Sequence, residues 1–243
     1  AASAAAAITV SSLKDLPTLL PDDIVLACVP EREDPRDAFV SHVAKTLEDL
    51  PVGANVGTAS LRRQAQTLYR RPDLGVVVMR GNVDTRLRKL EAGEADATFL
   101  ALAGLRRLGL ESRAASLVDP NESPPAACQG AIAITARADD ARTLDLLRDF
   151  ENISARIEIE AERAFLAALD GSCRTPIAAL ARKEGDTLHF IGEALTPDGT
   201  ARWRRTGEIV LSANAHSDAR SLGETFGREI REEAGGAIVM RDV

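Results

Sequence analysis

Short runs of apolar residues alternate with segments of helical periodicity through residues 8–135. In the segment after Asn82, for example, Val83, Leu87 and Leu90 fall at i, i+4 and i+7, and Gly93 follows as a helix stop. Such alternation predicts a mostly parallel sheet that binds ligands in the loops at its strand ends. Strands are expected at residues 8–10, 24–29, 55–57, 76–79, 98–102 and 131–135, and helices at 60–71, after 82 and from 104.

The pattern changes beyond Asn152, where one apolar helical stripe that includes Ile157 and Phe165 continues to Asp170-Gly171. Further strands are expected near residues 178–181, 188–194 and 207–211, and a last helix at about 218–233. Residues 197–200 (Pro-Asp-Gly-Thr) have the composition of a hairpin turn. This part of the chain is therefore predicted to form a small α+β domain of its own.

Two polar, proline-containing segments interrupt the first pattern, at residues 31–37 and at Pro124-Pro125. Segments of this kind are typical of crossings between lobes. The predicted fold class is α/β, with two hinged lobes and a small C-terminal α+β domain. The expected boundaries are residues 1–30 with 131–149 for the first domain, 36–124 for the second and 150–243 for the third.

Composition narrows the possible partners. The 243 residues carry a net charge of −7, and 26 of the 30 basic residues are arginine. An acidic chain is a poor candidate for general nucleic-acid binding, because a basic face supplies most of that affinity. No apolar run approaches the roughly 20 residues of a membrane span. We therefore expect a small-molecule ligand, with neither nucleic acid nor a membrane as partner. A monomer is a separate expectation that composition does not determine.

The cysteines indicate the chemical environment. Cys28, Cys128 and Cys173 are odd in number and lack a Cys-x-x-Cys spacing, so neither a disulfide framework nor a metal site is expected. No export signal is visible in residues 1–10. A reducing, cytoplasmic location is the expectation that follows.

The stretch from Gly57 to Gln64 (Gly-Thr-Ala-Ser-Leu-Arg-Arg-Gln) carries the clearest chemical signal. Free backbone N–H groups at a helix start, the hydroxyls of Thr58 and Ser60, and the forked guanidinium groups of Arg62 and Arg63 all suit an anion. The alternative interpretation is a serine-capped surface helix with two solvated arginines. The segment by itself favours neither interpretation.

Two further strand ends repeat this arrangement of glycine and arginine. Arg80-Gly81-Asn82 precedes a helix that contains Arg86, and Arg106-Arg107 follows Gly104. Arginine at three strand ends of one lobe indicates a ligand with several carboxylates.

Lys14-Asp15 and Cys173 are the remaining candidates, and each has a structural alternative. A carboxylate after a strand and beside a lysine can stabilise a developing cation or move a proton, or it can form an exposed ion pair of little worth. Cys173 lies in a Gly-Ser-Cys-Arg-Thr-Pro loop, where the arginine favours a thiolate, although a loop thiol can also be inert.

Taken in order, these motifs resemble the porphobilinogen deaminase family from about residue 8 to the C-terminus. Each motif is weak alone, but the combination is specific. The motifs are residues 12–17 (Ser-Leu-Lys-Asp-Leu-Pro), 32–38 (Arg-Glu-Asp-Pro-Arg-Asp-Ala), 57–64, 80–82 with 85–87 (Arg-Gly-Asn, Thr-Arg-Leu), 101–105 (Ala-Leu-Ala-Gly-Leu), 129–130 (Gln-Gly) and 171–173 (Gly-Ser-Cys).

The resemblance implies a transferase that condenses four porphobilinogens head to tail into hydroxymethylbilane, with loss of ammonia, in tetrapyrrole biosynthesis. It also implies two lobes resembling periplasmic binding proteins and a covalent dipyrromethane cofactor held as a thioether by Cys173. Asp15 would be the catalytic carboxylate, and Arg80 and Arg107 would face the incoming substrate. The positions that would hold the cofactor's acetate and propionate groups are Lys14, Thr58, Ser60, Arg62, Arg63 and Arg86.

Three departures from the family pattern leave alternatives open. Ser11 stands where histidine is usual, and Cys128 stands where a small residue, commonly glycine, is expected. Family members usually have several dozen residues before the Lys-Asp motif, whereas thirteen precede Lys14 here, so we expect these 243 residues not to sustain full turnover. The alternatives are a non-enzymatic two-lobed binder of small polycarboxylates and an inactive truncated homologue.

Overall fold

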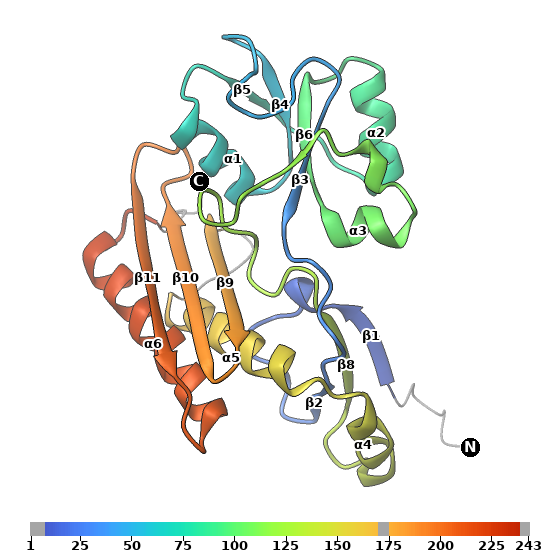
Figure 1. Ribbon diagram of the computed structural model, residues 1–243, viewed down its shortest axis with the longest axis vertical. Coiled ribbons are helices and arrows are strands. Elements are labelled where there is room, and N and C mark those ends of the chain that lie inside the picture. The colour runs from blue at the N-terminus through green and yellow to red at the C-terminus, as the bar shows by residue number, and fades with distance from the viewer. Residues whose placement is uncertain (1–7, 170–174, 239–243) are drawn as a thin grey trace.

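The computed structural model describes residues 8–169 and 175–238. It contains a three-stranded sheet, a five-stranded sheet and a second three-stranded sheet, each with its own helices (Figure 1). These three sheets with their helices confirm the predicted α/β class with two lobes and a C-terminal α+β domain. The domain boundaries given above remain a prediction.

The first lobe is built on an antiparallel sheet of order β1-β8-β2. Its strands form at short aliphatic runs of the sequence, where strands were predicted. The short 3-10 helix η1, directly after β1, carries Lys14 and Asp15. Two further helical segments close the lobe at its outer end (Figure 1). The elements are β1 (Ile8–Ser12), η1 (Leu13–Asp15), β2 (Ile24–Cys28), β8 (Ile132–Arg137), α4 (Ala141–Leu147) and η3 (Arg148–Phe150).

The second lobe is built on a sheet of order β5-β4-β6-β3-β7 with helices on both sides (Figure 1). Alternate residues of β3 face opposite sides, so Ala38 and Val40 join one apolar cluster while Phe39 joins the other. The elements are β3 (Asp37–Ser41), β4 (Asn55–Gly57), α1 (Leu61–Arg70), β5 (Gly75–Val77), α2 (Val83–Glu91), β6 (Ala97–Ala101), α3 (Leu102–Arg107), η2 (Glu111–Arg113) and β7 (Ser116–Leu117).

The expectation of mostly parallel sheets is wrong. Only the pairs β4–β5 and β4–β6 are parallel, whereas β3 pairs antiparallel with both β6 and β7, and the first lobe is antiparallel throughout. Parallel pairing follows from a strand-helix-strand crossover. Strand β3 instead follows a polar segment with no crossover helix before it, so its direction in the sheet is not constrained by a crossover.

The C-terminal domain packs two helices against an antiparallel sheet of order β11-β10-β9 (Figure 1). The predicted hairpin turn at residues 197–200 joins β10 to β11, and Gly199 there has a φ of +71°. Cys173 lies outside the described residues. The elements are α5 (Ile153–Ala168), β9 (Ile177–Glu184), β10 (Thr187–Leu195), β11 (Arg202–Val210) and α6 (Ala215–Ala234).

The two segments that cross between the lobes are bonded to each other. The Glu33 N–H donates to the Gly130 carbonyl at 3.1 Å, and the Arg32 Nε donates to the Gln129 carbonyl at 3.0 Å. Arg32 also forms a buried fork with Glu162 of α5. The crossing segments are thus fastened to the C-terminal domain. Within the described part of the chain, no helix has the length and apolar character needed to cross a membrane.

Gly130 is the tightest point of this crossing, and its replacement tests the packing. Its φ is +86°, and a Cβ there would lie 2.3 Å from the Glu33 carbonyl oxygen. We expect Gly130→Ala to lower the free energy of unfolding by at least about 2 kcal/mol, from left-handed strain and a backbone clash together. Denaturant unfolding measures this loss.

Gly93→Ala is the matched control. Gly93 also has a positive φ, +76°, but nothing lies within 4 Å of its Cβ position. Only the strain, about 1–2 kcal/mol, should remain there. Equal losses for the two variants would contradict a steric role for the crossing.

Candidate active site

Three strand ends and one strand beginning meet at a single edge of the second lobe. Strands β5, β4 and β6 are neighbours and point the same way, so the loops after them share this edge. Because β3 runs antiparallel to β6, its first residue, Asp37, pairs with Ala101 at the end of β6. The antiparallel strand therefore places a carboxylate among the arginines.

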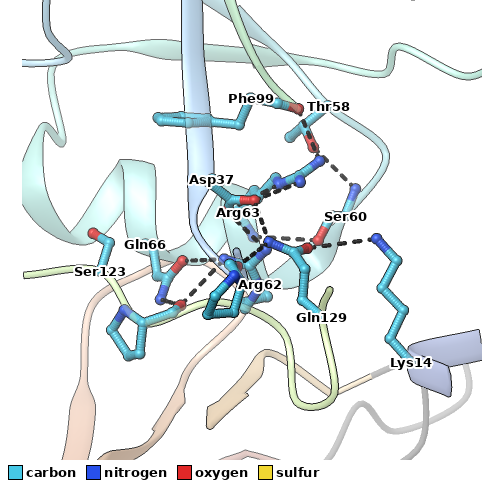
Figure 2. Close-up of polar contacts among 12 residues, drawn as sticks. Lys14, Asp37, Thr58, Ser60, Arg62, Arg63, Gln66, Phe99, Ser123 and Gln129 are labelled. Atoms are coloured by element: carbon cyan, nitrogen blue, oxygen red, sulfur yellow. Dashed lines mark hydrogen bonds and ion pairs between the residues drawn. The ribbon is translucent and has the colours of Figure 1, made fainter. Parts of the chain in front are cut away.

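Asp37 binds both arginines of the 57–64 motif in the protein interior (Figure 2). One carboxylate oxygen accepts from Arg62 Nη2 at 2.9 Å and from Arg63 Nε at 3.3 Å, and the other accepts from Arg63 Nη2 at 2.7 Å. Arg62 and Arg63 are only 5% and 7% exposed. Burial alone would raise the pKa of Asp37, but the two guanidinium groups outweigh it and hold that pKa far below its usual range.

The remaining guanidinium donors of this pair are mostly used inside the protein. Arg63 Nη1 donates to the Phe99 carbonyl at 2.8 Å, and Arg62 Nη1 donates to Gln66 Oε1 at 2.8 Å. Arg62 Nε is buried and has no hydrogen-bond partner in the described structure. One donor of the pair is therefore left over for a ligand or a water molecule.

Thr58 and Ser60 shape the turn that presents these arginines. Thr58 Oγ1 accepts from the Ser60 N–H at 3.1 Å, and Ser60 Oγ accepts from the Arg63 N–H at 3.4 Å as the cap of α1. Ser60 is thus a helix cap, as the structural alternative held. The expectation that the two arginines are solvated is wrong, because both side chains are buried.

Lys14 reaches this cluster from the first lobe. Its Nζ lies 3.5 Å from Gln129 Oε1, and Gln129 Nε2 in turn donates to Asp37 at 2.9 Å (Figure 2). Burial, and next the charge of Arg63, lower the pKa of Lys14 to about 8, although Asp37 and Asp15 oppose this shift. Positive charge is therefore in excess at this point between the lobes.

The other predicted site residues are nearer the solvent. Asp15 is exposed, and its carboxylate bonds to no other described residue. Arg86 donates from Nε to the Gly81 carbonyl at 2.9 Å, and burial followed by the charge of Arg63 lowers its pKa. Arg80 and Arg107 are exposed and form no ion pair with a described residue. Of these four side chains, Arg86 acts on the cluster through the charge of Arg63 and Asp15 through that of Lys14, and none is bonded to the buried group.

Sequence reasoning missed Asp37, Gln129 and Gln66 as members of the cluster. Asp37 was assigned to a polar crossing segment, although the apolar Ala-Phe-Val that follows it is a strand signal. Gln129 was recognised only as part of the Gln-Gly family motif, and no role was predicted for its side chain. No local signal marks Gln66, whose partners lie at least 58 residues away except for Arg62.

Two of the three cysteines are described, and neither is available for chemistry. Cys28 and Cys128 are free and buried. Burial, and next the Glu162 carboxylate, raise the pKa of Cys128. Cys128 has a φ of +64°, the left-handed region that favours glycine, which gives the physical reason for the small residue expected there. No cluster of three or more metal-ligating side chains occurs among the described residues.

Family models match most of the chain. The porphobilinogen deaminase, dipyromethane cofactor binding domain matches residues 2–145, and the porphobilinogen deaminase C-terminal domain matches residues 156–232. The chain belongs to the porphobilinogen deaminase family. Its function is accordingly that of an enzyme of tetrapyrrole biosynthesis that acts on porphobilinogen with a dipyrromethane cofactor.

Curated relatives agree with the family models. The porphobilinogen deaminase of Caulobacter vibrioides (strain NA1000 / CB15N) is 55% identical over 234 residues, which cover 95% of this chain and 72% of the relative. That of Phenylobacterium zucineum (strain HLK1) is 54% identical over 233 residues, with the same coverage. That of Nitrobacter hamburgensis is 54% identical and covers 93% of this chain and 70% of the relative.

Solved structures resemble the chain only distantly. A lipoprotein of the YaeC family from Enterococcus faecalis V583 has a TM-score of 0.38 and 15% identity, covering 55% of this chain and 64% of that one.

The residues of the site fit a dipyrromethane, which bears several carboxylates. Arg62 Nε is a buried donor without a partner among the described residues. Burial and then the charge of Arg63 lower the pKa values of Lys14 and Arg86, and a bound anion would offset the second of these effects. These groups come from both lobes, so a ligand that they hold would bridge the lobes.

Removal of the Asp37 charge tests the buried cluster. We expect Asp37→Asn to lower the free energy of unfolding by about 3–5 kcal/mol, because two guanidinium groups would stay buried without their counterion. Since the pKa of Asp37 is held below its usual range, this contribution is complete above about pH 4 and is lost only in stronger acid.

Urea unfolding at pH 7 measures the loss. Asp139→Asn, at an exposed carboxylate paired with Arg137, is the control and should change stability little. Similar losses for the two variants would show that the guanidinium groups do not depend on Asp37.

The titration of Lys14 tests the excess of positive charge. The chain has four lysines, so their side-chain carbon NMR signals can be followed separately. In the ligand-free chain one lysine should titrate near pH 8, and Asp15→Asn should lower that pKa further, because the Asp15 charge raises it. The folded chain holds this proton less tightly than the unfolded chain, so stability should rise between about pH 8 and pH 10.5.

Asp22→Asn, at another exposed carboxylate of the first lobe, is the control and should leave the titration unchanged. Four lysines that all titrate near 10.5 would contradict this account of the site.

Proposed function

We propose that the dipyrromethane is attached through Cys173 and that its acetate and propionate groups bind the side chains around the buried cluster. The observation that carries this proposal is the excess of positive charge where Lys14 meets the Arg62–Asp37–Arg63 group. When bound, the dipyrromethane supplies the pyrrole carbon that attacks the incoming ring. The residues proposed to hold it are Lys14, Thr58, Ser60, Arg62, Arg63 and Arg86.

Asp15 is the proposed catalytic carboxylate. It follows β1 at the edge of the first lobe, it is exposed, and its charge acts on Lys14. When the C–N bond of porphobilinogen breaks and ammonia leaves, the substrate ring becomes cationic. The negative charge of Asp15 would stabilise that cation, and its oxygens would accept from the pyrrole N–H groups.

Arg80 and Arg107 are proposed to bind the carboxylates of the incoming porphobilinogen. Both are exposed: Arg80 follows β5, and Arg107 ends α3, the helix after β6. Strands β5 and β6 flank β4, and the loops after these parallel strands share one edge. Neither arginine forms an ion pair with another described residue, so their guanidinium forks are available. Arg106 differs from them because Glu33 and Glu111 hold it.

The boundaries of the domains, the oligomeric state and the location belong to the same proposal. The boundaries are residues 1–30 with 131–149, 36–124 and 150–243, and the separate sheets support them. A monomer in the cytoplasm is proposed, without nucleic-acid or membrane partners. The net charge of −7 and the two free, buried thiols support this part.

Substitution of Asp15 and of Cys173 separates catalysis from cofactor attachment. With porphobilinogen as substrate, Asp15→Asn should lower kcat for ammonia release by roughly 10²–10³-fold while the cofactor stays attached, because the cation loses its counterion. Intact-mass measurement of Cys173→Ser should show no two-pyrrole adduct.

The control for Asp15→Asn is again Asp22→Asn, which should keep the parent rate. A parent rate in Asp15→Asn would remove the catalytic role of that carboxylate. An adduct that persists in Cys173→Ser would place the attachment elsewhere.

A further inference from the structure

The C-terminal domain contacts the two lobes in chemically different ways. Toward the first lobe it shares one apolar cluster, in which Leu13, Val29 and Ala133 pack with Ile157 and Phe165. Toward the second lobe its contacts include hydrogen bonds from α1, the Arg202 guanidinium over the Tyr69 ring of α1, and a hydrogen bond from Arg204 to the Asn121 carbonyl. The strands β10 and β11 and the turn between them lie beside this helix (Figure 1).

One of these polar contacts continues to the arginine pair. Gln66 of α1 accepts from Arg62 Nη1 at 2.8 Å through Oε1, and its Nε2 donates to Glu193 Oε1 of β10 at 3.0 Å. Gln66 Nε2 also donates to the Pro124 carbonyl at 2.9 Å (Figure 2). A single side chain thus links a strand of the C-terminal domain to Arg62.

The direction of the Gln66 amide is set by three neighbours. The Arg62 guanidinium only donates hydrogen bonds, whereas the Glu193 carboxylate and the Pro124 carbonyl only accept them, so a reversed amide would face all three with the wrong atoms. Glu193 shares the Nε2 end of Gln66 with Pro124 and holds that end toward β10. Gln66, Arg62 and Glu193 are all buried, with exposed fractions of 6%, 5% and 1%.

Two buried polar atoms that have no hydrogen-bond partner in the described part of the chain lie at the two ends of this link. Arg62 Nε and Glu193 Oε2 are buried without a hydrogen-bond partner among the described residues. Arg202 and Arg204 approach that Glu193 oxygen only to 3.7 Å. Each unpaired atom costs free energy, so both ends of the link have hydrogen-bonding capacity left over.

We propose that Glu193, acting through Gln66, is a positioning residue for Arg62, so that the C-terminal domain sets the geometry of the arginine pair that binds the cofactor. The proposal rests on the cofactor role of Arg62 proposed above. Since the same domain carries Cys173, the domain that tethers the cofactor also orients a side chain that holds it. Glu193 itself contacts neither the cofactor nor the substrate.

Exchange of the two side chains tests the link. Glu193→Gln removes the charged acceptor of Gln66 Nε2 and leaves the Pro124 carbonyl as its acceptor, and Gln66→Glu alone sets two buried carboxylates against each other. Each single variant should lower the fraction of protein that carries the cofactor, measured by intact mass. In protein that does carry it, kcat should fall roughly tenfold, the order expected for a lost hydrogen bond to a charged group, with little change in KM.

The double variant Glu193→Gln with Gln66→Glu should recover part of the losses of Gln66→Glu. Its new carboxylate at position 66 accepts from Arg62 and from the new amide at position 193, which removes the repulsion between two carboxylates. The hydrogen bond to the Pro124 carbonyl stays lost, so recovery is measured against Gln66→Glu. KM should stay nearly constant throughout, because Arg62 is proposed to hold the tethered group and not the incoming ring.

Gln64→Ala is the matched control on the same helix. Gln64 Nε2 donates to the Pro197 carbonyl of the C-terminal domain at 3.3 Å, and no hydrogen bond joins it to Arg62. Loss of this contact should leave the loaded fraction and kcat unchanged. Thermal unfolding of all variants reports any loss of stability separately.

The outcomes distinguish this inference from the function on which it rests. The inference is overturned if the single variants lower only the melting temperature and keep the parent loading and kcat, or if the double variant shows no recovery relative to Gln66→Glu. Arg62→Lys serves as the reference. If Arg62→Lys carries the cofactor and turns over normally, the cofactor role of Arg62 is wrong. If Arg62→Lys is impaired while the Glu193 and Gln66 variants keep the parent loading and kcat, only the inference is wrong.

Discussion

The buried carboxylate of Asp37 makes it possible for two adjacent arginines to lie in the protein interior. Arg62 and Arg63 would repel each other there, and removal of each guanidinium from water is costly. Asp37 receives four hydrogen bonds, three from these arginines and one from Gln129. One carboxylate cannot neutralise two cations, so the cluster stays positive. Next to burial, the charge of Arg63 is the main cause of the lowered pKa values of Lys14 and Arg86.

The same cluster unites parts of the chain that are far apart in sequence. Gln129 contacts Lys14 of the first lobe and Asp37 of the second, and its own carbonyl accepts from Arg32. Arg32 in turn binds Glu162, which also accepts from the Cys128 and Ala181 N–H groups. The crossing between the lobes is thus continuous with the site. A carboxylate-bearing ligand held by Lys14 and the arginines would stabilise one arrangement of the lobes over others.

Much of the site could be predicted because its signals are local. The turn from Thr58 to Arg63 follows from a serine cap and a glycine, and arginines after three neighbouring strands share an edge whenever those strands are parallel. Asp37 could not be assigned in this way. Its place depends on β3 running antiparallel to β6, and the residues around it are equally compatible with a linker. Gln66 and Glu193 meet across 127 positions of sequence, and no periodicity reports such a contact.

Features that depend on neighbours in the chain can be predicted from local sequence: the aliphatic strands, the capped start of α1, the hairpin turn at residues 197–200 and the family motifs. The direction of β3, the pairing of Asp37 with both arginines and the polar link from Glu193 to Arg62 become known only from the folded chain. Local periodicity and capping are set within a few residues, whereas strand direction and the partner of a buried charge are chosen by packing between segments that meet only when the chain has folded.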